Sequence, residues 1–436
     1  MHGTDVCIDG KPEDFLPEGT HCTCGSSNLR KETDIFDVWF ERGSSFRAVC
    51  MARPELSFPS DVYLEGTDQH RGWFQLSLLP SMAAYGEKPF RTVVTHGFIV
   101  DEWGQKLSKS KKKESKYDVT AAADCVKVFG ADVVRLWIAS VDYKEDVLFS
   151  EEVVRRLNAS YFAIRNCFRF MLGNLDGFRV ENALPLEHMP PVDRWALAML
   201  AKTETACRRH YEDFEFHRLF QEFKNFCDVT LSSDYFDILK DRLYCDPVDS
   251  LSRRSATTVL YTLARSMAVM ISPVLVHTCE EIWDELRTMG ETLDSVHLAE
   301  WPVFDESVYD STLPQVFGRL MAVRYAARRR LELLRAENTV RRTEEARVEL
   351  YTSDLELGML IAGMQDTLAD LFKVSEVELL DAPASGMTED EDIKGLLVKA
   401  LKVEHGKCAR CWCHRPEVGS IEQHPELCSR CAEAVK

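Results

Sequence analysis

The most regular pattern of apolar positions lies in the middle of the chain. From Val154 to Leu175, apolar residues recur every three or four positions, so they form one stripe along a long helix. Similar patterns cover four further segments, at residues 191–211, 216–243, 252–289 and 313–337. Few strand patterns interrupt them. The pattern therefore predicts a helical bundle over residues 151–335.

The part of the chain before this bundle has a different pattern, in which short apolar runs alternate with helical ones. Two strands are expected, around Val62–Leu64 and Thr92–Val100, and two helices, over His70–Tyr85 and Asp118–Phe129. Such alternation is typical of α/β layers, where loops at the strand ends can hold a ligand. We therefore expect an α/β domain over residues 1–150.

Shorter runs follow the bundle. Residues 346–380 alternate between strand and helix patterns and predict a small α+β unit. Residues 382–392 are rich in Pro, Ser, Gly and acidic side chains, which favours a linker. The end of the chain is therefore expected to hold an α+β unit with its linker over residues 336–395 and a terminal segment over 396–436.

The composition narrows the class of protein. At 436 residues the chain is too long for one compact core, and it has 45% hydrophobic and 28% charged residues, as a globular protein does. No apolar run approaches the roughly 20 residues that span a bilayer, and no charged-then-apolar leader opens the chain. We therefore expect no membrane partner and a cytoplasmic location.

The formal net charge of −18 argues against nonspecific binding of nucleic acid over the whole surface. Local basic patches could still hold a nucleic acid, at Lys106–Lys116, Arg328–Arg330 and Arg341–Arg342. Each of these patches is more often a solvated helix or loop face, so none of them predicts RNA binding by itself.

The 15 cysteines are unevenly distributed. Ten are scattered up to Cys279, mostly in apolar helical patterns where a buried free thiol is expected, and Cys22-Thr-Cys24 favours a plain turn over a broken zinc knuckle. The other five crowd into the last 29 residues. In a cytosolic chain, such clustering indicates metal binding rather than disulfides.

Four of these cysteines have the spacing of a zinc site. Two Cys-x-x-Cys turns, separated by 16 residues, contain Cys408, Cys411, Cys428 and Cys431. Each turn directs two sulfurs at one centre, which predicts one tetrahedral Zn²⁺ with a structural role, since four thiolates leave no open position. Three neighbouring side chains are possible substitute ligands, namely Cys413, His414 and His424.

A lysine-rich segment follows the strand pattern of residues 90–100. Residues 106–116 contain six lysines and three serines, after the turn Asp101–Gly104. A basic loop at the end of a strand suits a polyphosphate, because ammonium groups act as mobile charges on phosphate oxygens. A solvated surface cluster is the alternative interpretation of the same charges.

The motifs around this lysine-rich segment resemble those of a known enzyme family. Lys106-Leu-Ser-Lys109-Ser110 resembles the Lys-Met-Ser-Lys-Ser loop of class I aminoacyl-tRNA synthetases. Upstream stand, in order, Asp37-Val-Trp-Phe-Glu-Arg-Gly43, Tyr63-Leu-Glu-Gly-Thr-Asp-Gln-His-Arg-Gly-Trp-Phe74 and Thr95-His-Gly-Phe98. In this order they resemble the second half of the catalytic domain of isoleucyl-tRNA synthetases. The resemblance covers nearly the whole chain from Asp34, including the terminal Cys-x-Arg-Cys-Trp segment.

The resemblance implies a fold and a reaction. The fold would be the C-terminal half of a class I, Rossmann-type α/β catalytic domain, then an α-helical anticodon-binding bundle and a zinc ribbon that contacts tRNA. The reaction would be ATP-dependent activation of isoleucine to isoleucyl-AMP and its transfer to tRNA(Ile), with Mg²⁺ accompanying ATP. A monomer is expected, and Trp412 is a candidate for base stacking or for packing on the zinc knuckle.

The resemblance also implies roles for residues near the strand ends. Glu65 would contact the amino group of isoleucyl-adenylate, and Gly66 would allow its close approach. Asp68 and Gln69 would lie beside the adenylate, and His96 near the adenine. In the lysine loop, Lys109 would stabilise the triphosphate as pyrophosphate leaves and Lys106 would assist, so catalysis would rest on position and charge.

Several departures from the family pattern affect these expectations. The chain contains no His-x-x-His, and about 35 residues precede the first matching block, so an N-terminal half-site and an editing domain are not expected in it. Leu107 replaces Met, Lys111–Glu114 replaces a residue followed by Gly-Asn, and Arg42 stands where a small residue is usual.

These departures leave two hypotheses. The first is a partial isoleucine–tRNA ligase that is inactive alone in adenylate formation. The second is a tRNA-binding module without catalysis, or the half of a split enzyme that a missing N-terminal half completes in trans.

Overall fold

The computed structural model describes residues 9–32, 38–100, 104, 122–304 and 310–435. Contacts between residues divide the chain into two compact units. Unit 1 is Met1–Ile99 with Tyr143–Asp146, and unit 2 is Val100–Asp142 with Val147–Lys436. Among the described residues, no helix is both long enough and apolar enough to cross a bilayer.

Unit 1 is built on a β-α-β arrangement. Strands β1 (Ser60–Gly66) and β2 (Phe90–His96) are parallel, and helix α3 (Trp73–Tyr85) connects them. The stacked rings of Tyr63 and Trp73, with centroids 4.2 Å apart, fix α3 against β1. Shorter elements complete the unit: η1 (Pro12–Asp14), α2 (Val38–Gly43), η2 (Phe46–Cys50) and η3 (Thr67–Arg71). The two-residue strand β3 (Ile99–Val100) follows, and its second residue belongs to unit 2.

The expected strands and helices of this region are present with shifted ends. The strand predicted at Thr92–Val100 is divided, because Gly97 lies between β2 and β3 and donates its N–H to the Tyr143 carbonyl at 2.9 Å. The helix predicted from His70 begins at Trp73, after the 3₁₀ turn η3. Helix α4 (Ala122–Phe129) matches the end of the predicted 118–129 helix, whose residues 118–121 lie outside the described residues.

Gly43, at the end of α2, marks a close contact with α3. A Cβ added there would lie 2.3 Å from the Leu76 carbonyl oxygen, so the backbones approach too closely for any side chain. We expect Gly43→Ala to destabilise unit 1 by about 1–3 kcal/mol, because the backbones must move apart. Hydrogen exchange at the β1 amides of the full chain measures this, with Ser44→Ala as the control. Unchanged protection in Gly43→Ala would contradict the contact.

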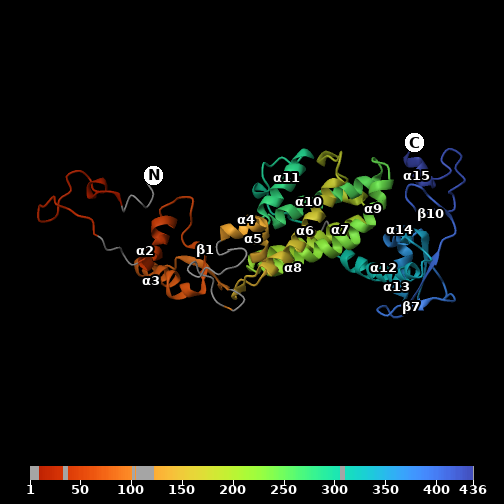
Figure 1. The fold of residues 1–436 in the computed structure, drawn as a ribbon, viewed down its shortest axis with the longest axis horizontal. Helices are drawn as coiled ribbons and strands as arrows, with labels where there is room; N and C mark the ends of the chain where they lie inside the picture. Colours follow the sequence, from red (N-terminus) through yellow and green to blue (C-terminus); the bar gives the residue numbers. More distant parts are fainter. Residues whose placement is uncertain (1–8, 33–37, 101–103, 105–121, 305–309, 436) are drawn as a thin grey trace. The chain divides into compact units, whose positions relative to one another are not determined.

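Helices dominate the first part of unit 2, as the bundle prediction required (Figure 1). Their bounds are α5 (Ala131–Ser140), α6 (Glu151–Gly173), α7 (Pro191–Glu212), α8 (Phe216–Asn225), α9 (Phe236–Cys245), α10 (Leu251–Ile271), α11 (Val276–Thr288) and α12 (Leu313–Ala336). Shorter elements lie among and around them: β4 (Val147–Leu148), η4 (Val180–Asn182), η5 (Leu186–His188), η6 (Phe226–Tyr235), η7 (Val296–Leu298) and η8 (Thr343–Glu345).

The apolar stripe that predicted α6 faces the core. Val154, Ile164, Phe168 and Met171 are buried, and Leu175 is buried just beyond the end of the helix. The long patterns at 216–243 and 252–289 each cover two α-helices. A π-helical segment, η6, joins α8 to α9, and a turn at residues 272–275, which includes Pro273, separates α10 from α11.

A four-stranded sheet follows the bundle in the order β6-β5-β8-β7. Its strands are β5 (Ala346–Thr352), β6 (Glu376–Leu379), β7 (Thr388–Glu389) and β8 (Leu396–Lys402), with helices α13 (Leu355–Gly363) and α14 (Gln365–Phe372). The α+β unit is therefore present. The segment 382–392, expected as a linker, instead contributes β7 and the buried Asp390, which accepts hydrogen bonds from Arg329.

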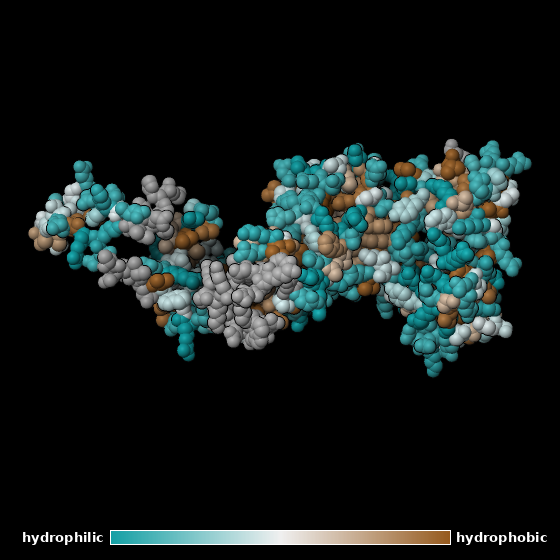
Figure 2. Space-filling model, in the orientation of Figure 1, coloured by the Kyte–Doolittle hydropathy of each residue, from teal (hydrophilic) through white to brown (hydrophobic). Residues whose placement is uncertain are grey.

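The last segment has little regular structure. It contains β9 (Gly406–Lys407), antiparallel to β10 (His414–Arg415), and the short helix α15 (Ser429–Ala434). Strand β8, which the sequence boundaries placed with this segment, pairs with β5 in the preceding sheet. On the face shown in Figure 2, hydrophilic residues cover most of unit 2, and hydrophobic residues appear in separate patches.

Candidate functional site

The side chains assigned to the adenylate lie at the carboxyl ends of the two parallel strands. Glu65 and Gly66 end β1, and His96 ends β2 directly beside Gly66 in the register. Ligands of α/β proteins bind outside the carboxyl ends of such strands, because loops and helix N-termini converge there. The fold therefore brings Glu65, Gly66 and His96 together at one sheet edge.

The backbone at Gly66 leaves room that a side chain would fill. A Cβ there would lie 2.7 Å from Asp68 Oδ1 and 3.6 Å from a carbon of the His96 ring. Gln69 is buried: its Nε2 donates to Asp68 Oδ2 at 3.1 Å, and its Oε1 accepts from the Trp73 N–H at 3.1 Å. Asp68 and Gln69 are thus fixed beside Gly66, which is compatible with the roles predicted for them.

Glu65 has a cationic partner. Arg42, at the end of α2, donates from Nη2 to Glu65 Oε1. The side chains of Arg42 and Glu65 are 39% and 32% exposed, so solvent and small ligands can reach the pair. Arg42 departs from the family pattern in the sequence, but only the tertiary structure brings it into contact with Glu65. Lys106 and Lys109 lie outside the described residues, so their predicted roles stay predictions.

The four predicted metal ligands form one buried cluster. The sulfur atoms of Cys408, Cys411, Cys428 and Cys431 all lie within 4.8 Å of one another. Tetrahedral Zn²⁺ with bonds of about 2.3 Å requires sulfurs about 3.8 Å apart. The Cys411 and Cys428 sulfurs are 3.8 Å apart, so this pair already has the separation that zinc requires.

Cys413 lies next to this cluster but belongs to a different group. Its sulfur, the Cys411 sulfur and an Asp241 oxygen also lie within 4.8 Å of one another. A hydrogen bond from Cys413 lowers the pKa of the Cys411 thiol to about 4, whereas burial raises the pKa of Cys431 to about 11. Cys413 is therefore a hydrogen-bond partner of Cys411 that lies outside the set of four sulfurs.

Two arginines attach the cysteine cluster to helix α9. Arg410 donates to the Cys245 carbonyl, which α9 leaves free at its C-terminus, and to the Tyr244 carbonyl at 3.4 Å. Arg430 pairs with both oxygens of Asp241, one of them at 2.9 Å. This role was not predicted from the sequence, although both Cys-x-x-Cys turns carry Arg at the third position.

Trp412 adopts a left-handed backbone conformation, with φ of +66°, and its side chain is 43% exposed. The Arg342 guanidinium lies 4.1 Å from its ring centroid, and Lys407 Nζ lies 5.8 Å from it. A cavity of about 430 Å³ adjoins Trp412 and is lined by residues of α9, α14 and the cysteine segment. The exposed ring and its cations are compatible with a contact to RNA.

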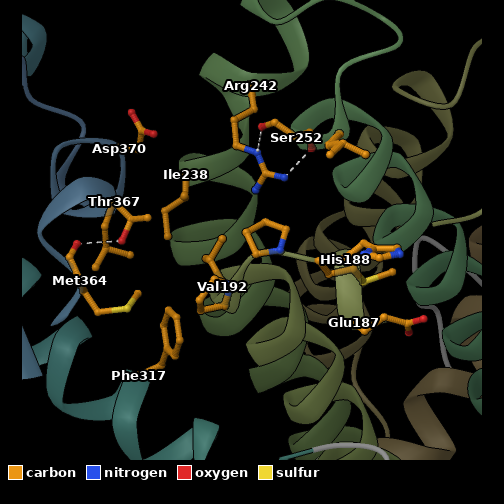
Figure 3. A pocket seen from close by; sticks show the side chains of 15 residues that line it. Glu187, His188, Val192, Ile238, Arg242, Ser252, Phe317, Met364, Thr367 and Asp370 are labelled. Carbon is orange, nitrogen blue, oxygen red and sulfur yellow. Dashed lines mark hydrogen bonds between the residues drawn. The ribbon is translucent and has the colours of Figure 1, made fainter. Parts of the chain in front are cut away.

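A second cavity of unit 2, of about 400 Å³, lies between the bundle and α14 (Figure 3). Phe317, Val192 and Met364 give it an apolar lining, and Arg242 lies at its edge with Ser252. Arg242 donates to both carboxylate oxygens of Asp193, at 2.9 and 2.7 Å.

This buried ion pair holds three helices together. Asp193 also accepts from the Tyr235 hydroxyl at 2.9 Å and from the Ser255 hydroxyl. Burial by itself would lower the pKa of Arg242, but the Asp193 carboxylate more than offsets it, so the pKa is raised. Arg242 therefore stays protonated, and the wall of the cavity is a structural junction of α7, α9 and α10.

Comparison with protein families assigns three segments of the chain. A model described as tRNA synthetases class I (I, L, M and V) matches residues 9–150. The anticodon-binding domain of tRNA ligase matches residues 193–350, and the zinc finger found in FPG and IleRS matches residues 406–434. The zinc-finger match agrees with the buried four-cysteine cluster and supports a structural zinc.

Curated proteins similar to the chain are isoleucine–tRNA ligases. That of Syntrophotalea carbinolica is 42% identical over 98% of this chain and 46% of its own length. That of Moorella thermoacetica is 42% identical over 100% of this chain and 47% of its own length. The chain thus spans about half the length of the curated relatives it matches.

A solved structure shows the same fold at low identity. The agnB2 LeuRS of Agrobacterium radiobacter K84, crystallised in a ternary complex with tRNA and LeuAMS, has a TM-score of 0.51 to this chain. It is 17% identical, and the match covers 66% of this chain and 36% of the LeuRS. Sequence family and fold therefore agree.

Proposed function

Since the chain belongs to the isoleucine–tRNA ligase family of class I tRNA synthetases, we propose that it serves isoleucine–tRNA ligation. In this reaction the isoleucine carboxylate attacks the α-phosphorus of ATP, isoleucyl-AMP forms and pyrophosphate leaves. The isoleucyl group then passes to tRNA(Ile), and AMP is released. The substrates are thus isoleucine, ATP with Mg²⁺, and tRNA(Ile).

The observation that carries this proposal is the position of Glu65, Gly66 and His96 at adjacent carboxyl ends of β1 and β2. An adenylate lying across this edge would place its ammonium group at Glu65, its backbone against Gly66 and its adenine near His96. Lys109, with Lys106, would neutralise the departing pyrophosphate. No covalent intermediate on the protein is needed, because position and charge suffice.

The other segments supply binding to tRNA in this proposal. The anticodon-binding bundle would hold one end of tRNA(Ile), and the cysteine segment would extend that surface through Trp412 and its neighbouring cations. Zn²⁺, held by Cys408, Cys411, Cys428 and Cys431, would fix the fold of this segment when bound.

Pyrophosphate exchange tests the catalytic part. We expect the zinc-loaded chain alone not to exchange pyrophosphate into ATP, because it matches about half of the relatives' length. We expect exchange to appear when the N-terminal half of the Moorella thermoacetica enzyme is added in trans. In that mixture Lys109→Ala should lower the rate about 100-fold, as does loss of one group that stabilises a developing charge.

Lys113→Ala is the matched control, because it removes a lysine from the same run without touching the Lys-Leu-Ser-Lys-Ser motif. Equal losses in both variants would contradict the specific role of Lys109. Exchange by the chain alone would overturn its expected inactivity.

The second candidate function is a tRNA-binding module without catalysis. The match of residues 193–350 to an anticodon-binding domain favours it independently of the strand-end residues. Measurable binding of a tRNA(Ile) transcript, with no exchange in any mixture, would favour this module over the ligase.

A further inference from the structure

Glu65 is a carboxylate that a ligand can reach. It is the residue before the end of β1, at the sheet edge where ligands of such folds bind, and its side chain is 32% exposed. A half-exposed carboxylate at this edge attracts a cationic group of a ligand. In the described part of unit 1, the cation that pairs with the Glu65 carboxylate is the Arg42 guanidinium.

Arg42 is held in this position by a second side chain. The Trp73 indole N–H donates to the Arg42 carbonyl at 3.1 Å, which fixes the Arg42 backbone. The Arg42 guanidinium also lies 5.3 Å from the Trp73 ring centroid, within range of a cation–π contact. Because Trp73 is stacked on Tyr63 of β1, the guanidinium is attached to the same strand that carries Glu65.

Two cations that bind the Glu65 carboxylate together repel each other, so each binds less tightly than it would alone. An ammonium group that binds there must displace Arg42 or accept a second positive charge beside it, and either option weakens binding.

We propose that Arg42 is an internal competitor for the carboxylate of Glu65 and weakens binding of ligands that carry a primary ammonium group, aminoacyl adenylates in particular. The proposal rests on the function proposed above and adds a positioning residue that tunes the affinity of the same site. Arg42 touches Glu65, and its effect on the ligand passes through that carboxylate.

Binding measurements on the full chain test this. The probe is isoleucyl-sulfamoyladenosine, a stable isoleucyl-adenylate analogue with a free ammonium group, and dissociation constants are taken from ligand-detected NMR. Exposed ion pairs contribute up to about 1 kcal/mol, or about fivefold in affinity. We therefore expect Arg42→Ser to bind the analogue about threefold to fivefold more tightly than the unchanged chain.

Two further variants separate charge from structure. Arg42→Lys keeps a cation and should bind like the unchanged chain, which a merely structural role of Arg42 would not produce. Arg47→Ser removes an exposed arginine from the same segment and should also leave the affinity unchanged. The desamino analogue, which lacks the ammonium group, should bind the unchanged chain and Arg42→Ser equally.

The outcomes distinguish this proposal from the proposed function. Measurable binding that is equal or weaker in Arg42→Ser overturns the competition by Arg42 and leaves the adenylate site standing. Equal tightening for the desamino analogue also overturns it, since the effect would not depend on the ammonium. Absence of binding in every variant, both alone and mixed with the N-terminal half of the Moorella thermoacetica enzyme, overturns the adenylate site itself, and the competition with it.

Discussion

Replacement of Cys431 by Ser is expected to abolish zinc retention and to unfold residues 406–434. Cys431 is fully buried and is one of four sulfurs within 4.8 Å of one another. The segment has two two-residue strands and one six-residue helix, so its own packing cannot hold it. Zinc binding of about 10 kcal/mol or more stabilises such segments, and loss of a ligand removes most of it.

Metal content by atomic spectroscopy and hydrogen exchange at the α15 amides measure this effect. The unfolding should extend to the contact with α9, because Arg410 and Arg430 reach Cys245 and Asp241 from within the two cysteine turns. Exchange at the C-terminal end of α9 should therefore rise in the same variant.

Cys413→Ser is the matched control. Its sulfur lies beside Cys411 but outside the set of four, so this variant should retain one zinc per chain. Zinc loss in Cys413→Ser, with retention in Cys431→Ser, would show that the ligand set is assigned wrongly.

The second large effect is expected at the buried pair of Asp193 and Arg242. Asp193→Ala would leave the Arg242 guanidinium buried without the carboxylate that pairs with it. It would also remove the acceptor of the Tyr235 and Ser255 hydroxyls. Breaking one side of such a pair costs about 3–5 kcal/mol. Urea unfolding followed by circular dichroism of the helices should show a correspondingly earlier transition.

Two controls sharpen this test. Asp213→Ala removes an exposed carboxylate at the end of the same helix, paired with Arg209 at 3.5 Å, and should cost less than about 1 kcal/mol. The double variant Asp193→Asn with Arg242→Met removes both charges and should recover part of the loss. A loss in Asp193→Ala no larger than that in Asp213→Ala would contradict the structural role of the pair.

The helices of the bundle could be predicted because their signal is local. The stripe from Val154 to Met171 needs only the period of a helix to show which face is buried, and α6 has that face in the core. Interruptions are harder to predict. The π-helical segment η6 has an apolar pattern like its neighbours, so the sequence at 216–243 suggested no change of helix type.

The sheet beyond the bundle shows a different limit. The composition of residues 382–392 favoured a linker, but Asp390 is buried and pairs with Arg329 from α12, 61 residues earlier. Strand β8 likewise pairs with β5, about 50 residues earlier, rather than with the segment that follows it. Pairing between distant segments depends on tertiary packing, and the composition of one short segment carries no information on it.

In the candidate site too, some features could be predicted from the sequence and others could not. The sequence placed Glu65, Gly66 and His96 in motifs, and gave four cysteines the spacing of a zinc site, because both features depend on short runs of residues. It also marked Arg42 as unusual. It could not show that Arg42 pairs with Glu65, since the two residues are 23 positions apart in the chain and lie on different elements.

The sequence by itself therefore determined the family, the helical bundle and the four cysteines predicted to bind zinc, because motif order, periodicity and ligand spacing are properties of the linear chain. Only the tertiary structure decided which charges meet. It placed Arg42 on Glu65, Arg242 on Asp193, and the two arginines of the cysteine turns on α9. Electrostatic interactions depend on distance in space and on burial, and both are fixed when distant segments pack together.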